Sequence, residues 1–150
     1  MLLPLPDLDA TEALGLRLGL LLRAGDSVLL EGPLGAGKSA LARAMLRTAC
    51  RDPALEVPSP SYTLVQAYQA PGFWIHHYDL WRLDGEAGLA ELGWDDAREG
   101  AVLVEWPDRL GRLRPRDALT VTLAPTAADL GEARLATLHG WPDRLGGVPA

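Results

Sequence analysis

Residues 32–39, Gly-Pro-Leu-Gly-Ala-Gly-Lys-Ser, bring together groups that can hold a phosphate chain. The glycines allow backbone angles that a side chain forbids, so successive N–H groups can turn toward phosphate oxygens. Lys38 supplies a positive charge for the β- and γ-phosphates, and Ser39 supplies a hydroxyl that can bind Mg²⁺. The spacing matches the P-loop pattern at every fixed position. This segment therefore predicts a site for a nucleoside triphosphate with Mg²⁺.

The segments on either side of this loop are suited to position it. Residues 27–31 are largely apolar and predict a short buried strand, and residues 40–50 are rich in good helix formers. A helix that begins here would direct the positive end of its dipole at the bound phosphates. The alternative is a glycine-rich turn without a ligand, which the flanking strand and helix disfavour.

Two carboxylates at the ends of predicted strands are candidates to act on such a nucleotide. Residues 101–105 form an apolar run that ends in Glu105, which is typical of a parallel core strand. The carboxyl end of such a strand lies where open α/β sheets bind ligands. Asp79 ends a second predicted strand, residues 73–79, and resembles a carboxylate that holds Mg²⁺ through water. Glu105 is the stronger candidate, and its alternative is a rim glutamate that faces water.

Strand alternation places His77 and Asp79 on one face of their strand and His76 and Tyr78 on the other. The ordinary interpretation of both histidines is a residue on the sheet surface or a hydrogen-bonded core residue. A His–Asp pair also suits metal chemistry, but two ligands do not specify a metal.

The remaining patterns predict an α/β fold. We expect a three-layer P-loop NTPase-like sandwich around a small mixed sheet with a parallel centre and antiparallel edge strands. The first helix begins near Asp9, in a capping box with Glu12, or with Thr11 as the cap, and its first turn lies near the nucleotide base. The other expected elements are an extended lead-in at Pro4 and Pro6, an antiparallel pair at 63–68 and 73–79, a helix at 83–92, strands at 119–123 and 133–138, and a connection at 124–131.

Length, charge and cysteine content limit the classes of function. The 150 residues predict one domain over residues 1–140 and a frayed, flexible C-terminal tail over 141–150. A net charge of −6 argues against a protein that grips nucleic acid by itself. The single cysteine, Cys50, excludes an internal disulfide and a cysteine cluster for zinc. The first residues lack a signal-peptide pattern and no apolar run is long enough for a bilayer, so we expect a cytoplasmic protein without a membrane partner.

Four segments in this order resemble the bacterial TsaE (YjeE) family. They are the P-loop at 32–39, Ser-Pro-Ser-Tyr-Thr-Leu-Val at 59–65, His-Tyr-Asp-Leu-Trp-Arg-Leu at 77–83 and Val-Glu-Trp-Pro at 104–107. The P-loop is shared by many proteins, whereas the other three segments in this order are far more specific. The resemblance implies a P-loop ATPase needed for threonylcarbamoyladenosine modification of tRNA.

The resemblance also implies roles for individual residues. Lys38, Asp79 and Glu105 would be catalytic, and Ser39 and Glu105 would bind Mg²⁺. The implied ATP contacts are Thr11, Gly35, Ala36, Gly37, Lys38, Ser39 and Ala40, and the implied switch or partner contacts are Ser61, Thr63 and Trp106. Ser61 stands where the family usually has Thr, and Ser39-Ala40 stands where it often has two Thr, so Ala40 lacks a side-chain contact to the α-phosphate.

Family resemblance further implies slow ATP hydrolysis by the protein alone and action on a TsaB–TsaD complex, with tRNA involved only indirectly. Two other functions compete with this interpretation. One is a small P-loop kinase in which the arginine cluster Arg109, Arg112, Arg114 and Arg116 forms a lid over an acceptor. The other is a nucleotide-binding interaction module without useful turnover. The position of the arginines, late in the chain and between two predicted strands, disfavours the kinase.

Overall fold

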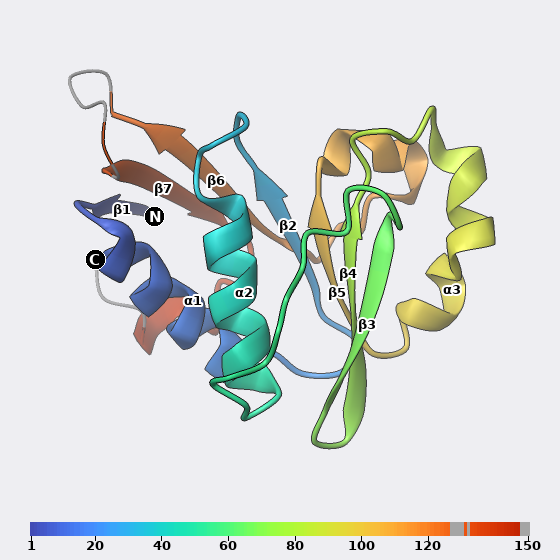
Figure 1. The fold of residues 1–150 in the computed structure, drawn as a ribbon, viewed down its shortest axis with the longest axis horizontal. Helices are drawn as coiled ribbons and strands as arrows, with labels where there is room; N and C mark the ends of the chain where they lie inside the picture. Colours follow the sequence, from blue (N-terminus) through green and yellow to red (C-terminus); the bar gives the residue numbers. More distant parts are fainter. Residues whose placement is uncertain (127–130, 132, 148–150) are drawn as a thin grey trace.

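The computed structural model describes residues 1–126, 131 and 133–147 of the chain. Its centre is a seven-stranded sheet with the order β1-β7-β6-β2-β5-β4-β3 (Figure 1). The four strands from β6 to β4 run parallel to one another, and β1, β7 and β3 pair antiparallel, as predicted. The strands are β1 Leu2–Leu5, β2 Ser27–Glu31, β3 Val65–Ala70, β4 Phe73–Asp79, β5 Ala101–Glu105, β6 Leu119–Pro125 and β7 Arg134–His139.

Helices cover both faces of this sheet and make three layers (Figure 1). Alternate residues of β2 face opposite layers: Val28 and Leu30 belong to the core beneath the two long helices, and Leu29 belongs to a second core on the other face. The long helices are α1 Leu8–Leu21 and α2 Lys38–Ala49, the other face carries the 3₁₀ helices η1 Glu86–Leu92 and η2 Pro107–Leu113 with α3 Trp94–Ala97, and η3 Leu145–Gly147 lies near the C-terminus.

The two long helices approach each other closely, and this contact supports the segment that follows the P-loop. A Cβ added at Gly15 of α1 would lie 2.6 Å from the Cβ of Ala44, and one added at Gly19 would lie 2.7 Å from the carbonyl oxygen of Met45. Real side chains do not tolerate such distances, so these two glycines permit α1 to pack directly against α2.

The beginning of the chain differs from the predictions in two ways. The extended lead-in is strand β1, an edge strand that tolerates Pro4 because it pairs on one side only, with β7. Helix α1 begins at Leu8, and its cap is Asp7, whose carboxylate accepts a hydrogen bond of 2.8 Å from the Ala10 N–H. The predicted cap at Asp9 or Thr11 is therefore wrong by two to four positions.

In the middle of the chain the predicted elements are present, but their bounds and the type of one helix differ from the predictions. β3 and β4 form the expected antiparallel pair, but β3 begins at Val65 because Leu64 has a left-handed backbone with φ of 68°. The helix predicted over 83–92 is the 3₁₀ helix η1, which begins at Glu86 after an extended Gly85. Gly93, with φ of 71°, ends it as expected. The predicted connection over 124–131 lies partly outside the described residues.

Residues 141–147 lie against the body of the protein, which differs from the frayed tail that we expected. Trp141 and Leu145 are buried in the core that includes β1, α1 and α2. Arg144 lies over the Trp141 ring at 3.8 Å and pairs with Asp26 at 2.8 Å. A tryptophan buries a large apolar area, which local composition rich in Gly and Pro does not reveal. Residues 148–150 of that predicted tail lie outside the described residues.

Within the described residues, none of the helices combines the length and the apolar character needed to cross a lipid bilayer.

Candidate nucleotide-binding site

The P-loop connects the end of β2 to the start of α2, as the sequence predicted. Gly37 has φ of 100°, a backbone that glycine adopts easily, and it lets α2 begin directly at Lys38. A Cβ at Gly32 would lie 2.5 Å from the carbonyl oxygen of Leu123 in β6, so only glycine permits this approach. The loop borders a cavity of about 300 Å³, which we call the P-loop cavity. Its lining residues are Leu34, Gly35, Gly37, Lys38, Ser39, Ser59, Ser61, Asp79, Glu105 and Trp106.

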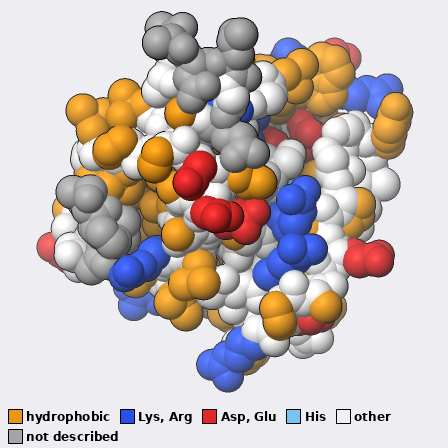
Figure 2. All heavy atoms as spheres, turned by 60° about the vertical axis from the view of Figure 1, so that its left-hand side comes forward, with side chains coloured by type: hydrophobic (Ala, Val, Ile, Leu, Met, Phe, Trp, Pro, Cys, Tyr) orange, Lys and Arg blue, Asp and Glu red, His pale blue; other side chains and the backbone are white. Residues whose placement is uncertain are grey.

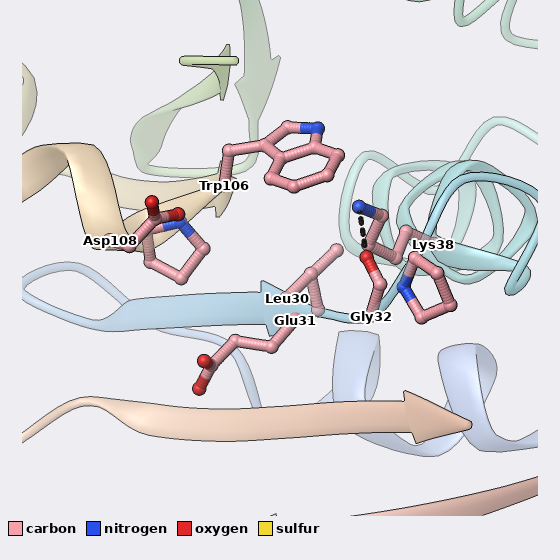
Figure 3. Close-up of a pocket in the computed structure, with 8 residues that line it drawn as sticks. Leu30, Glu31, Gly32, Lys38, Trp106 and Asp108 are labelled. Atoms are coloured by element: carbon pink, nitrogen blue, oxygen red, sulfur yellow. Dashed lines mark hydrogen bonds between the residues drawn. The ribbon is translucent and has the colours of Figure 1, made fainter.

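Lys38 is the single lysine of the sequence, and its side chain is buried. Its Nζ donates a 2.6 Å hydrogen bond to the Gly32 carbonyl and lies 3.9 Å from the centre of the Trp106 ring (Figure 3). Burial lowers the pKa of Lys38, and the nearby carboxylates, Glu105 first, act in the opposite direction. The ammonium is therefore kept at the mouth of the loop without a direct carboxylate partner among the described residues.

Asp79 and Glu105 stand side by side at the carboxyl ends of β4 and β5, where the strand register pairs them. Both are buried, at 6% and 4% exposure. Burial is the largest cause that raises the pKa of Asp79, and repulsion from Glu105 adds to it. Hydrogen bonds from the Trp81 N–H and the Ser61 hydroxyl, and the electrostatic interaction with His77, lower the pKa of Asp79. The structure thus brings together the two acids that the sequence singled out.

His77 belongs to the site, although the sequence favoured an ordinary role for it on the sheet surface or in the core. Its Nε2 lies 2.7 Å from Oε2 of Glu105, and both side chains are buried. The Nδ1 atom of the same ring is buried and has no hydrogen-bond partner among the described residues. Strand alternation already placed His77 on the face of Asp79, but the contact to Glu105 depends on the neighbouring strand. His77 orients the Glu105 carboxylate.

The loop between α2 and β3 contributes one hydroxyl to the acids. Ser61 donates a hydrogen bond of 3.3 Å to Asp79 and shares one of 2.7 Å with Ser59. Thr63 does not border the P-loop cavity, and its hydroxyl accepts a hydrogen bond from the Gln66 side chain. Of the two predicted switch hydroxyls, the structure therefore brings only Ser61 to the site.

Three other predicted nucleotide contacts do not border the P-loop cavity: Ala36, which is buried within the loop, and Thr11 and Ala40, which lie next to it. Thr11 is buried, and its methyl carbon lies 3.8 Å from where a Cβ on Gly37 would be. Ala40 borders a separate hollow of about 370 Å³ between α1 and α2, together with Asp9 and Arg43.

Trp106 joins three hollows of the surface. It has a left-handed backbone with φ of 59°, which is uncommon for a residue with a side chain. Its ring borders the P-loop cavity, a hollow of about 320 Å³ with Glu31 and Asp108 (Figure 3), and one of about 440 Å³ with Tyr62 and Trp81. Trp106 therefore borders all three hollows while its ring packs against the Lys38 ammonium.

Arginines near the site divide into two groups. In the arginine cluster that the competing kinase hypothesis would use as a lid, Arg109 donates to the Leu83 carbonyl, Arg112 pairs with Glu86 and Arg114 pairs with Glu31. None of these three borders the P-loop cavity. Arg134, which the sequence reasoning missed, donates directly to backbone carbonyls of the P-loop. No local pattern singles it out, because the contact joins β7 to a loop about a hundred residues earlier.

Strand, glycine loop and helix on a mixed sheet define an α/β protein with a P-loop-like fold. The fold is similar to the crystal structure of YdiB from Bacillus subtilis, with a TM-score of 0.76, 20% identity and coverage of 96% of this chain and 87% of that one. Residues 5–134 match the family model described as threonylcarbamoyl adenosine biosynthesis protein TsaE.

Relatives identified from sequence point to the same family. The chain is 35% identical over 116 residues to the tRNA threonylcarbamoyladenosine biosynthesis protein TsaE of Rickettsia conorii. The matched segment spans 77% of this chain and 66% of that protein. It is 38% identical over 114 residues to the protein of the same name from Synechocystis sp., covering 73% and 71%. This chain belongs to the TsaE family.

Proposed function

We propose that this protein is a Mg²⁺-dependent ATPase that serves threonylcarbamoyl modification of adenosine in tRNA by assisting a TsaB–TsaD complex. The observation that carries the ATPase is one cavity bordered by Lys38, Ser39, Asp79 and Glu105 together with the P-loop glycines. Family membership and the names of the relatives support the pathway. The body of residues 1–140, together with residues 141–147 that pack on it, would act as one domain of a cytoplasmic protein.

The donor chemistry of the cavity fits Mg²⁺. The described residues contain no group of three or more His, Cys, Asp and Glu side chains placed to hold a metal. A P-loop magnesium needs fewer protein ligands, because it keeps several waters and binds phosphate oxygens. Ser39 and Glu105 border the same cavity and would hold the ion, with Glu105 oriented by His77. When bound, Mg²⁺ would supply positive charge to the β- and γ-phosphates.

The residues of the chain would divide the work on ATP. Lys38 would exchange its bond to the Gly32 carbonyl for a phosphate oxygen, and the P-loop amides would bind further oxygens. Both kinds of contact stabilise the charge that develops during phosphoryl transfer. Asp79 would orient the attacking water and accept its proton, because its raised pKa makes it a better base than an ordinary aspartate.

The distribution of charge supports an indirect role toward RNA. The net charge is −6, and the face in Figure 2 mixes acidic, basic and hydrophobic side chains among its described residues. Phosphate contacts to RNA need a basic surface. The partner complex, rather than this chain, would therefore hold the tRNA.

The test is ATP hydrolysis by the purified protein, with and without TsaB and TsaD, at matched concentrations. We expect Mg²⁺-dependent phosphate release that is slow alone and faster with both partners. Release of phosphate without dependence on the partners would reject the assisting role. Transfer of the γ-phosphate to an added nucleoside or other small acceptor would support the kinase instead. Tight ATP binding without any turnover would support the interaction module.

A further inference from the structure

Arg134 at the start of β7 connects that strand to the P-loop. Its Nε donates a hydrogen bond of 3.0 Å to the Ala36 carbonyl, and its Nη2 donates one of 2.8 Å to the Gly35 carbonyl. The remaining Nη1 donates to the carbonyls of Ala133 and Gly131, on its own side of the connection. Every nitrogen of the guanidinium therefore contacts a backbone carbonyl, and two of these carbonyls belong to the phosphate-binding loop.

These contacts act on the amides that a P-loop offers to phosphate. In a trans peptide the C=O and the N–H point in opposite directions, and the described chain contains no cis peptide. When Arg134 holds the carbonyls of Gly35 and Ala36, it also fixes the directions of the next two N–H groups. The first, on Ala36, donates to the Pro33 carbonyl at 3.1 Å and so stabilises the turn of the loop itself. The second, on Gly37, must point away from the guanidinium, because it is trans to the Ala36 carbonyl that Arg134 holds, and it is the amide of this pair that could bind phosphate.

The glycines of the P-loop make its backbone flexible, so a contact that restrains it affects ligand binding. Gly35 and Gly37 both have positive φ, and glycine loses more conformational freedom on ordering than any other residue. A loop that is already ordered when the ligand arrives does not lose that freedom on binding, so its affinity is higher.

We propose that Arg134 is a positioning residue that holds the P-loop in its phosphate-binding conformation from the far side of the loop. The proposal rests on the proposed nucleotide site. Arg134 does not border the P-loop cavity, so it acts through the Gly35 and Ala36 carbonyls rather than on the nucleotide itself.

The shape of the arginine side chain fits this role. Its planar guanidinium presents several donors in a fixed fork, and here Nε and Nη2 reach two successive carbonyls at once. A lysine has one compact ammonium on a flexible stem and cannot bridge both carbonyls with the same geometry. We therefore expect Arg134→Lys to restore only part of what Arg134→Gln loses.

The experiment compares Arg134→Gln and Arg134→Lys with Arg144→Gln as a matched control. Arg144 also donates to a backbone carbonyl, that of Leu21, but it pairs with Asp26 at the opposite end of β2. Hydrogen exchange of the backbone N–H groups within residues 32–37, where Pro33 has none, measures the restraint directly in the nucleotide-free protein. Calorimetry with ATP and Mg²⁺ measures the Kd for ATP, which the restraint is expected to lower, and thermal unfolding of each variant measures stability.

Arg134→Gln should speed exchange in residues 32–37 and raise the Kd for ATP about tenfold, the size expected from losing two hydrogen bonds. KM should rise while kcat at saturating ATP stays within about twofold, because the acids are untouched. Arg134→Lys should lie between Arg134→Gln and the wild type. Arg144→Gln should lower the unfolding temperature without changing the exchange in residues 32–37 or the Kd for ATP.

Equal exchange and equal Kd in Arg134→Gln and Arg144→Gln would overturn the proposal. If Arg134→Gln does not fold, Arg134→Lys carries the same two readouts, and wild-type values for both would overturn it. A wild-type protein that binds no ATP would reject the proposed function, and the exchange of residues 32–37 would still decide whether Arg134 restrains the loop.

Discussion

A cation, carboxylates and an aromatic ring lie together at each end of β2, but among the described residues this cation is paired with a carboxylate only at the amino end. At the amino end, Arg144 pairs with Asp26 and stacks on Trp141, so that a cation, an anion and an aromatic ring satisfy one another. At the carboxyl end, Lys38 lies beneath Trp106 and bonds to a backbone carbonyl, although Asp79 and Glu105 border the same cavity.

The pairing of the cation indicates the role of each end of β2. A cation that is already paired with a carboxylate adds to stability but has little left to offer a ligand. A buried lysine whose pKa is lowered by burial is costly to keep, and a polyphosphate would relieve that cost. We therefore expect substitutions at the carboxyl end of β2 to affect binding and turnover, and substitutions at the amino end to affect stability.

The largest expected effect is that of Lys38→Ala. Losing the only ammonium at the loop should raise the Kd for ATP more than about a hundredfold, as expected when a charged contact to phosphate disappears. The free energy of unfolding should change by less than about 1 kcal/mol, because the substitution also removes a buried charge. Calorimetry and denaturant unfolding measure the two quantities. Retained tight ATP binding would remove the P-loop from the mechanism.

Because Lys38 is the only lysine, its chemistry offers a second readout. Bound ATP should protect its amine from acetylation, which mass spectrometry of the peptide that contains it would detect. Equal labelling with and without ATP, under conditions where calorimetry detects binding, would show that the ammonium stays with the Gly32 carbonyl.

An effect of comparable size is expected on turnover. Asp79→Asn and Glu105→Gln should each lower partner-stimulated kcat by about 10²–10³-fold, the range expected for a general base or an electrostatic contact in the transition state. ATP should still bind to Asp79→Asn, because Lys38 and the loop amides remain. The measurement is phosphate release at saturating ATP. Wild-type rates in both variants would show that neither acid is assigned correctly.

A smaller effect, on stability alone, is expected for Arg144→Gln. The pair with Asp26 is largely buried, at 17% and 11% side-chain exposure, so its loss should cost about 2 kcal/mol of unfolding free energy. Denaturant unfolding measures this loss. The Kd for ATP should stay at the wild-type value, and a parallel loss of binding would show that the two ends of β2 are coupled.

The smallest effect is a pH dependence from Asp79. Its pKa is raised in the folded protein, so the unfolded state releases this proton at lower pH. The group therefore favours folding below the ordinary aspartate pKa of 3.8, and this contribution is lost as the pH rises through the raised value. Relative to Asp79→Asn, the wild type should lose stability across that window. Parallel stability curves for the two proteins would contradict the raised pKa.

Much of the site could be predicted from the sequence because its parts are local. The P-loop pattern, the apolar run before Glu105 and the family segments each occupy one short stretch of chain. Short-range sterics and burial decide such stretches, so loop, strand and helix fall where the sequence places them. Details of turns were less accurate, as the cap at Asp7 and the 3₁₀ helix η1 show.

The sequence by itself determined which groups are available: one lysine, a glycine loop, a hydroxyl and two strand-end acids. Only the tertiary structure decided how they are held. His77 reaches Glu105 because β4 lies beside β5, Arg134 reaches the P-loop from β7, and Trp141 and Arg144 fold back onto the body of the protein. The physical reason is that these contacts join residues far apart in the chain, and strand order rather than local spacing brings them together.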